Sequence, residues 1–150
     1  MQLRDFFDPS RVELHLRGDS RDEVLAALLA RLELDGRSRT VLFRTLRRRE
    51  NLGSTGIGRG IAIPHCRSLM VSRLHLTYGR HSQGVDFRAI DDRPTHHFFL
   101  IIAPPLEVSG QYLPVLGKVA QFAKEADVPD RLAALESVAE FFELLDAKGI

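Results

Sequence analysis

The feature that most constrains the fold is a run of five apolar residues, 98–102, with the sequence Phe-Phe-Leu-Ile-Ile. A strand without polar alternation is typical of a sheet that is covered on both faces. Pro104 and Pro105 follow the run, and proline cannot donate a hydrogen bond to a neighbouring strand. We therefore predict a central strand at residues 98–102, with helices on both sides of its sheet.

Several other segments have the apolar spacing of amphipathic helices. Ser20, with Glu23 three residues later, has the pattern of a capping box, and we expect the helix that follows to close at Asp35-Gly36. A second helix is predicted from near Ser38 to the pair Arg49-Glu50. Further helices are predicted at residues 109–124, 129–135 and 138–147, the last of them capped by Ser137.

Shorter alternating segments predict the remaining strands, at residues 12–16, 61–63 and 74–78. Residues 79–84 are expected to form a loop, and 86–94 a short element followed by a turn. Strands that alternate with helices indicate an α/β domain. A chain of 150 residues is long enough for one such domain with its own core, so we assign residues 1–150 to a single domain.

Composition excludes several classes of protein. The formal net charge is +1, which gives no global attraction to nucleic acid or to an anionic membrane. The longest apolar run, residues 98–103, is too short to span a bilayer, and the first residues lack the pattern of a signal peptide. Cys66 is the single cysteine, so no internal disulfide can form. We expect a cytoplasmic protein without membrane insertion.

The segment most suggestive of chemistry is a glycine-rich stretch, residues 53–60, that leads through Ile-Ala-Ile-Pro to His65. Glycines allow the backbone to approach another group closely, and the β-branched run predicts a short strand. Histidine is the side chain whose ordinary pKa lies nearest neutral pH. A histidine at a strand end, beside a glycine loop and Arg49, is a candidate for handling an anion.

Other interpretations of these residues fit less well. Gly53 and Gly58 have the spacing of a Walker A loop, but Arg59 and Gly60 occupy the places of its lysine and hydroxyl residue, and no Gly-x-Gly-x-x-Gly opens a helix. Neighbours on an extended segment point to opposite faces, which argues against a Cys66-His65 nucleophile pair. The same alternation separates His96 from His97, and the spacing of the histidines predicts no metal site.

A run of arginines, Arg44, Arg47, Arg48 and Arg49, lies on the second predicted helix. We interpret its first three members as a solvated helix face. Few aromatic residues lie among these arginines, which together with the near-zero net charge disfavours binding to nucleic acid. An acidic protein partner remains an alternative for this face.

Three groups of residues together carry a resemblance to a known family. They are Arg49-Glu50 with the continuous segment 53–65, then Gly-Val-Asp-Phe at 84–87 with Asp-Asp-Arg-Pro at 91–94, and the apolar run that ends at Pro104. This pattern resembles the enzyme IIA family of the bacterial phosphotransferase system, of the fructose/mannitol type and closest to its nitrogen-regulatory members. The resemblance covers nearly the whole chain and implies a mixed β-sheet flanked by helices on both faces.

The resemblance also implies a chemistry, in which His65 accepts a phosphoryl group from the small histidine-phosphocarrier protein. Arg49 would bind that group, assisted by Ser54, Thr55 and the loop backbone at Gly56, without a cofactor or metal. The phosphorylation state would then regulate a protein partner such as a kinase or a transporter. Whether such a carrier counts as an enzyme stays open, as do two alternatives: a binding module that is never phosphorylated, and a sugar-specific transport subunit.

One position departs from the family pattern. Members that pass phosphate onward resemble one another in a second histidine, in a His-Leu-x-x-Leu pattern after the central strand. Here Tyr112 begins the matching segment, with Gln111 as the alternative if the register differs by one. Tyrosine is neutral below its pKa of about 10 and cannot supply the positive charge of a protonated histidine. We therefore expect slow onward transfer, which favours regulation over sugar transport.

Overall fold

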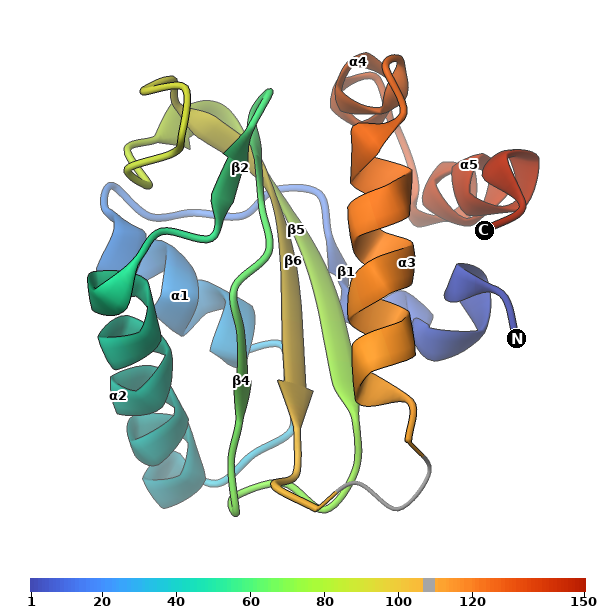
Figure 1. Cartoon of the computed structure of the whole chain (residues 1–150). Coiled ribbons are helices and arrows are strands. Elements are labelled where there is room, and N and C mark those ends of the chain that lie inside the picture. The colour runs from blue at the N-terminus through green and yellow to red at the C-terminus, as the bar shows by residue number, and fades with distance from the viewer. Residues whose placement is uncertain (107–109) are drawn as a thin grey trace.

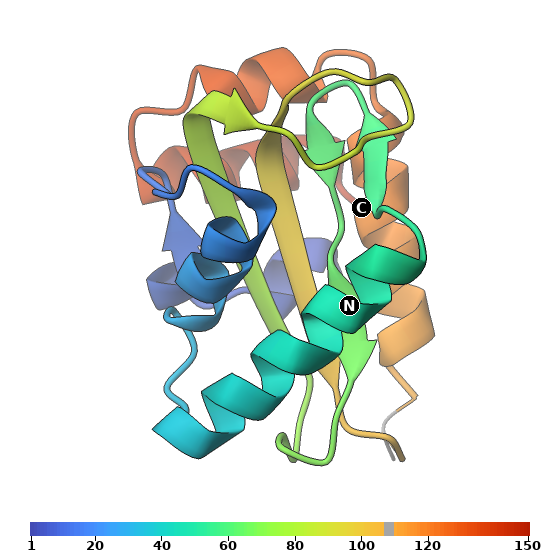
Figure 2. The same cartoon turned by 90° about the vertical axis from the view of Figure 1, so that its left-hand side faces the viewer.

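A mixed β-sheet separates two layers of helices in the computed structural model, which describes residues 1–106 and 110–150. Helices α1 (Arg21–Leu29) and α2 (Gly36–Leu52) cover one face, as Figures 1 and 2 show. The other face is covered by α3 (Tyr112–Lys124), α4 (Val128–Ala133) and α5 (Val138–Lys148). Two 3-10 helices, η1 (Leu3–Phe6) and η2 (Pro9–Arg11), lie near the N-terminus. The predicted α/β arrangement is confirmed.

Among the described residues, six strands form the sheet, and five of them lie in the order β1 (Val12–Glu13), β5 (His75–Val85), β6 (Thr95–Ala103), β3 (Ile61–Ala62) and β2 (Gly56–Gly58). The sixth, β4 (His65–Arg67), continues beyond β3 along the same side of β6. Strands β3 and β4 run parallel to β6, whereas β5 runs antiparallel to it. The sheet is therefore mixed, as the family resemblance implied.

Strand β6 lies at the centre of the sheet and supplies side chains to two hydrophobic cores. Phe99 and Ile101 pack in the core beneath α3 and α5. Leu100 and Ile102 point the other way, into the core beneath α1 and α2. Successive side chains of a strand alternate between faces, so an uninterrupted apolar run fills both cores at once. The predicted central strand is confirmed.

The N-terminal ends of the helices follow the predicted capping residues at two sites. Ser20 Oγ accepts from the Glu23 N–H at 3.2 Å, and Ser137 Oγ accepts from the Glu140 N–H at 3.2 Å. The prediction for Asp35 was wrong. Its carboxylate accepts from the Ser38 N–H at 2.7 Å, so Asp35 begins α2 instead of closing α1, which already ends at Leu29.

Two predicted loop and strand boundaries also differ from the structure. Residues 79–84 belong to β5, although the pairing with β6 is irregular between Arg80 and Val85. The backbone at Gly79 is packed so closely that a Cβ there would lie 2.8 Å from side-chain atoms of Leu16 and Leu28. This glycine serves packing and does not mark a turn. Residues 86–90 form neither a helix nor a strand.

The position of His65 relative to the strands differs from the prediction, which placed it at the end of a strand. Pro64 separates β3 from β4, and both short strands pair with β6. His65 therefore begins a strand, opposite Ile101, instead of following one. The helix predicted at 109–124 begins at Tyr112, and residue 109 lies outside the described residues. Across the described ranges, no helix is long and apolar enough to cross a membrane.

Candidate functional site

His65 lies half-buried on β4, at the edge of the sheet between α2 and α3 (Figure 1). Its Nδ1 is 2.7 Å from the backbone carbonyl oxygen of Ile63. A carbonyl can only accept, so Nδ1 carries the proton in this contact, and a neutral ring then keeps a lone pair on Nε2. The fold thus holds the imidazole in the tautomer whose Nε2 is a nucleophile.

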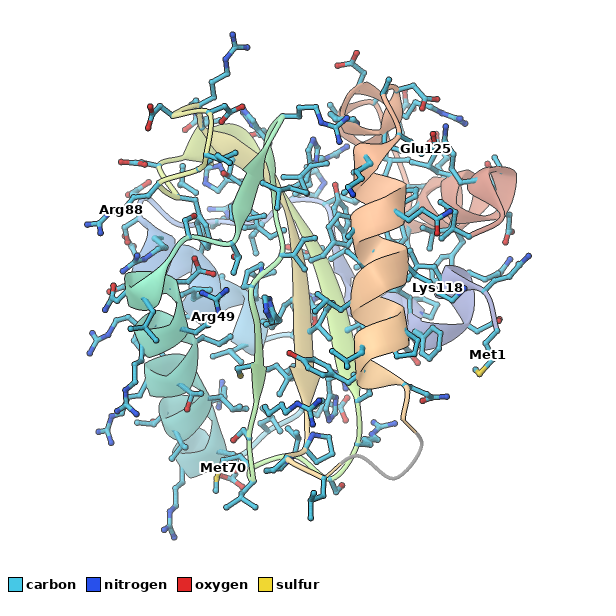
Figure 3. All side chains as sticks on the ribbon, viewed as in Figure 1. Met1, Arg49, Met70, Arg88, Lys118 and Glu125 are labelled. Carbon is cyan, nitrogen blue, oxygen red and sulfur yellow. The ribbon has the colours of Figure 1, made fainter. Side chains whose placement is uncertain are left out.

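Arg49 approaches the same edge from the last turn of α2. Figure 3 shows its side chain reaching from α2 toward β4. One guanidinium nitrogen, Nη1, donates to the carbonyl of Gly53 at 2.6 Å, which ties the arginine to the glycine loop. Arginine has five N–H donors, so others remain for an anion. The structure brings the predicted pair, Arg49 and His65, to one edge of the sheet.

Glu50 has a role that the sequence patterns did not reveal. Its side chain is buried, and its carboxylate accepts from both the backbone N–H of Thr55, at 3.0 Å, and the Thr55 hydroxyl. This contact fastens the end of α2 to the glycine loop. Glu50 follows Leu42 and Leu46 at intervals of four residues, and that spacing places all three on the buried face of α2.

The hydroxyl groups of the loop are engaged within the protein. Ser54 Oγ donates to the Phe87 carbonyl at 2.6 Å and accepts from the Gly56 N–H at 3.0 Å, while the Thr55 hydroxyl donates to Glu50. A Cβ at Gly56 would lie 2.9 Å from Ala89, so only glycine fits there. Donation by Ser54, Thr55 and Gly56 to a phosphate stays a prediction, since each must leave its present acceptor.

Tyr112, the first residue of α3, is buried against the same region. The Arg67 guanidinium lies over its ring, 4.6 Å from the centroid. Burial raises the pKa of the phenol and Cys66 adds to this, while Arg67 and Arg49 act in the opposite direction. Gln111 instead contacts Met1 Sδ at 3.6 Å. Of these two residues, Tyr112 is the one whose pKa responds to Cys66 and Arg49.

The competing chemistries find little support at this edge. Burial raises the pKa of the Cys66 thiol to about 12, so Cys66 stays protonated at neutral pH and is a poor nucleophile. In the part of the chain that the structure describes, no group of three or more His, Cys, Asp or Glu side chains is arranged to hold a metal ion.

The two helices that flank β4, α2 and α3, expose both apolar and basic side chains. Leu52, at the end of α2, is 82% exposed, and Leu113, in the first turn of α3, is 66% exposed. The predicted solvated face of α2 is exposed at Arg44, Arg47 and Arg48. Large exposed apolar side chains that flank a reactive group are typical of a surface that contacts other proteins.

Comparison with known proteins gives a consistent result. The family described as "Phosphoenolpyruvate-dependent sugar phosphotransferase system, EIIA 2" matches residues 5–148. A nitrogen regulatory protein of Pseudomonas aeruginosa is 34% identical over 153 residues, covering 97% of this chain and 95% of the relative. A crystal structure of the nitrogen regulatory protein IIA-Ntr from Neisseria meningitidis superposes with a TM-score of 0.85 at 27% identity, covering 95% of this chain and 98% of the other.

Proposed function

The chain belongs to the EIIA 2 family of the phosphoenolpyruvate-dependent sugar phosphotransferase system, and on this premise we propose that His65 carries a phosphoryl group that regulates a partner protein. The donor is the phosphohistidine of the small histidine-phosphocarrier protein. In the transfer, Nε2 of His65 forms a bond to phosphorus while the bond between phosphorus and the donor's imidazole nitrogen breaks.

The observation that carries this proposal is the hydrogen bond from His65 Nδ1–H to the Ile63 carbonyl. It leaves the lone pair on Nε2 before the reaction. After the reaction, both ring nitrogens are substituted, so the ring is positively charged and the carbonyl stabilises the remaining N–H. The proposal therefore assigns the phosphoryl group to Nε2 and requires no general base.

Arg49 supports the transfer electrostatically. Phosphoryl transfer needs stabilisation of charge on the equatorial oxygens more than it needs proton transfer. The guanidinium of Arg49 is already fixed at the loop through Gly53, so little reorganisation is required when the phosphate arrives. Ser54, Thr55 and the N–H of Gly56 are proposed as further donors, once they exchange their present acceptors for phosphate oxygens.

The test is incubation of the chain with the purified general phosphotransferase proteins and labelled phosphoenolpyruvate. We expect an acid-labile, alkali-stable label that His65→Ala abolishes. His15→Ala is the matched control, because His15 is exposed and lies outside this site. A label that persists in His65→Ala would contradict the assignment, and its absence from the native chain would favour the binding-module alternative.

Tyr112 supports regulation rather than sugar transport. A neutral phenol, whose pKa is raised further by burial, offers no positive charge to a phosphate on its way to a second protein. We expect little transfer from phosphorylated His65 to the cysteine of a sugar-specific acceptor domain, and a faster transfer after Tyr112→His. Rapid transfer by the native chain that the substitution does not accelerate would instead support a transport subunit.

The regulated partner is proposed to bind over Leu52, at the end of α2, and Leu113, at the start of α3, on the two helices that flank β4. A phosphoryl group on His65 adds negative charge at β4, between these two helices, so the two states of the protein present different surfaces to a partner. The exposed arginines of α2 favour a partner with an acidic face.

A further inference from the structure

A second site lies toward the opposite end of β6 from His65. It is a cavity of about 770 Å³, lined by residues of the β2–β3 turn, β5, the start of β6 and α4. His65 pairs with Ile101, whereas His96 and His97 line the cavity. Ile101 lies four residue steps along the strand from His97, which is roughly 13 Å. In Figure 1 this end of the sheet is at the top, near α4.

Arginines dominate the charge of this cavity. Arg59, Arg80 and Arg93 line it together with a single carboxylate, Asp130, so its formal charge is +2 when the histidines are neutral. Among the described residues, no carboxylate lies within 4 Å of the three guanidinium groups. Within the described residues, the three guanidinium groups therefore have no ion-pair partner. The Asp91 carboxylate lies close by and accepts from the backbone N–H groups of Arg59 and Arg93; these bonds lower its pKa, and the charge of Arg93 adds to this.

Two of these arginines are held at the ends of helices. Arg80 Nη1 donates to the carbonyls of Leu132, Ala133 and Leu135 at 2.9, 3.1 and 2.7 Å, at the end of α4. Arg59 donates to the carbonyl of Ala123, at the end of α3. A helix end carries only about half a negative charge, so two helix ends leave the cavity with a net charge of about +1.

The backbone fixes the direction of Arg59. Its φ is 57°, in the left-handed region that non-glycine residues rarely adopt. The Asp91 carboxylate accepts from the Arg59 N–H at 3.0 Å and stabilises this conformation. The backbone N–H of Arg93 is bonded to the same carboxylate at 3.1 Å, and the Arg93 side chain is exposed and can turn toward a bound molecule.

The remaining lining is uncharged. His96 Nδ1 donates to the His81 carbonyl at 3.0 Å, and His97 Nδ1 accepts from the Tyr78 hydroxyl at 2.9 Å while its other nitrogen bonds to the Pro129 backbone. Leu14, Pro94, Ala126, Pro129 and Ala133 add apolar surface. An uncharged wall beside a positive one suits a molecule with a phosphate end and a less polar body.

From this arrangement we infer that the cavity binds a small phosphorylated metabolite, of the size and chemistry of a nucleoside diphosphate. The phosphates pair with Arg93 and with those guanidinium N–H groups of Arg59 and Arg80 that the backbone carbonyls leave over. Arginine suits this task because its planar fork matches two phosphate oxygens. The volume lies within the range of small-molecule sites in proteins, roughly 300–1,000 Å³.

The test is calorimetric titration of the full chain at low salt with four probes: inorganic phosphate, pyrophosphate, adenosine diphosphate and adenosine. We expect adenosine diphosphate to bind best, pyrophosphate more weakly and adenosine not at all. If pyrophosphate binds as tightly as adenosine diphosphate, the ligand is an inorganic polyphosphate and the inferred nucleoside body is wrong. Absence of saturable binding for every phosphate probe at millimolar concentrations would overturn the inference.

Variants locate the binding within the molecule. Arg93→Ala should weaken binding of adenosine diphosphate by about tenfold, because it removes a charged donor whose side chain makes no hydrogen bond or ion pair among the described residues. Asp130→Asn should tighten it about twofold by removing a like charge. An unchanged affinity in Arg93→Ala would place the ligand elsewhere and overturn the assignment.

Arg88→Ala is the matched control, since Arg88 is exposed on the same 86–94 segment but lies on the α1–α2 side of the sheet, as Figure 3 shows. Binding should be unchanged in this variant, and a loss equal to that of Arg93→Ala would indicate only a general charge effect. Binding should also be unchanged in His65→Ala, which separates this site from the phosphoryl transfer.

Discussion

At the scale of single residues, Arg49 offers the sharpest test of the proposed phosphoryl transfer. Its Nη1 is bound to the Gly53 carbonyl, and its other N–H groups remain for phosphate oxygens. Arg49→Ala should slow phosphorylation of His65 by about 100-fold or more, as expected for loss of an electrostatic stabiliser. Arg49→Lys should restore only part of the rate, because lysine lacks the planar fork. The rate of label transfer is the measurement.

Arg48→Ala provides the control for that prediction. Arg48 is the exposed neighbour of Arg49 on α2, so its removal changes net charge equally but leaves the loop contact intact. Equal slowing by the two alanine variants would show that overall charge, and not the position of Arg49, is responsible.

Glu50 gives a second prediction, which concerns stability. Its carboxylate satisfies two buried donors of Thr55, so Glu50→Ala leaves both without an acceptor. We expect the free energy of unfolding to fall by about 2–4 kcal/mol. Glu50→Gln keeps one acceptor oxygen and should cost less. Chemical denaturation measures both, and equal stability of Glu50→Ala and the native chain would mean that water replaces the carboxylate.

The sequence predicted only part of the site's detail. The spacing of α2 placed Arg49 toward the sheet, and the glycine-rich segment pointed to His65. The hydrogen-bond partners of Ser54 and Thr55 could not be predicted from the sequence, because Phe87 is distant in the chain and Glu50 has a side chain that is usually found on the surface. The acceptor to which a hydroxyl donates depends on tertiary packing, which local sequence patterns do not encode.

At the scale of secondary-structure elements, two glycines should respond oppositely to the same change. Gly79 lies within β5, where a Cβ would come to 2.8 Å from Leu16 and Leu28. Gly79→Ala should therefore lower the free energy of unfolding by about 1–3 kcal/mol. Gly117 lies in α3, where a Cβ meets no atom within 4 Å. Gly117→Ala should raise stability by about 1 kcal/mol, because alanine favours the helix.

Thermal and denaturant unfolding of the two variants provides the check. A stabilising Gly79→Ala would mean that the two leucines move aside at little cost. In that case Gly79 would have no packing role, and another cause would be needed for a glycine in the strand.

Elements with strong local signals were predicted well. Strand β6 has an unbroken apolar run, and α1 and α5 begin at serine caps. Elements that depend on pairing with segments distant in the sequence were not predicted well. Strand β4 has three residues after a proline and exists through its pairing with β6. The extension of β5 through Gly79 likewise depends on β6 and on the close approach of α1.

At the scale of the whole molecule, His97 links stability to pH. Burial, with His96 and Arg80 nearby, lowers the pKa of this histidine from 6.5 to about 4. The unfolded chain then binds more protons between these two values, so stability falls as the pH is lowered through that window. The loss from His97 should approach about 3 kcal/mol by pH 4. Denaturation curves measured from pH 7 to pH 4 provide the test.

His97→Gln is the comparison for this prediction. The variant should be less stable at pH 7 but should lose less stability on acidification, so the two curves converge toward pH 4. The pKa values of Asp8, Asp35, Asp91 and Asp127 are lowered in the fold, so their contributions are lost only at still lower pH. Parallel curves for the native chain and the variant would mean that His97 does not titrate in this window.

The short outer strands of the sheet affect how the protein behaves at high concentration. Strand β1 has two residues, β2 has three and β4 has three, whereas the long strands β5 and β6 lie between them. Long exposed strand edges invite pairing between molecules and the growth of aggregates, and short edges suppress it. The strand that carries His65 is short and follows a proline. This edge of the sheet can therefore bind other proteins without pairing with further copies of the chain to form fibres.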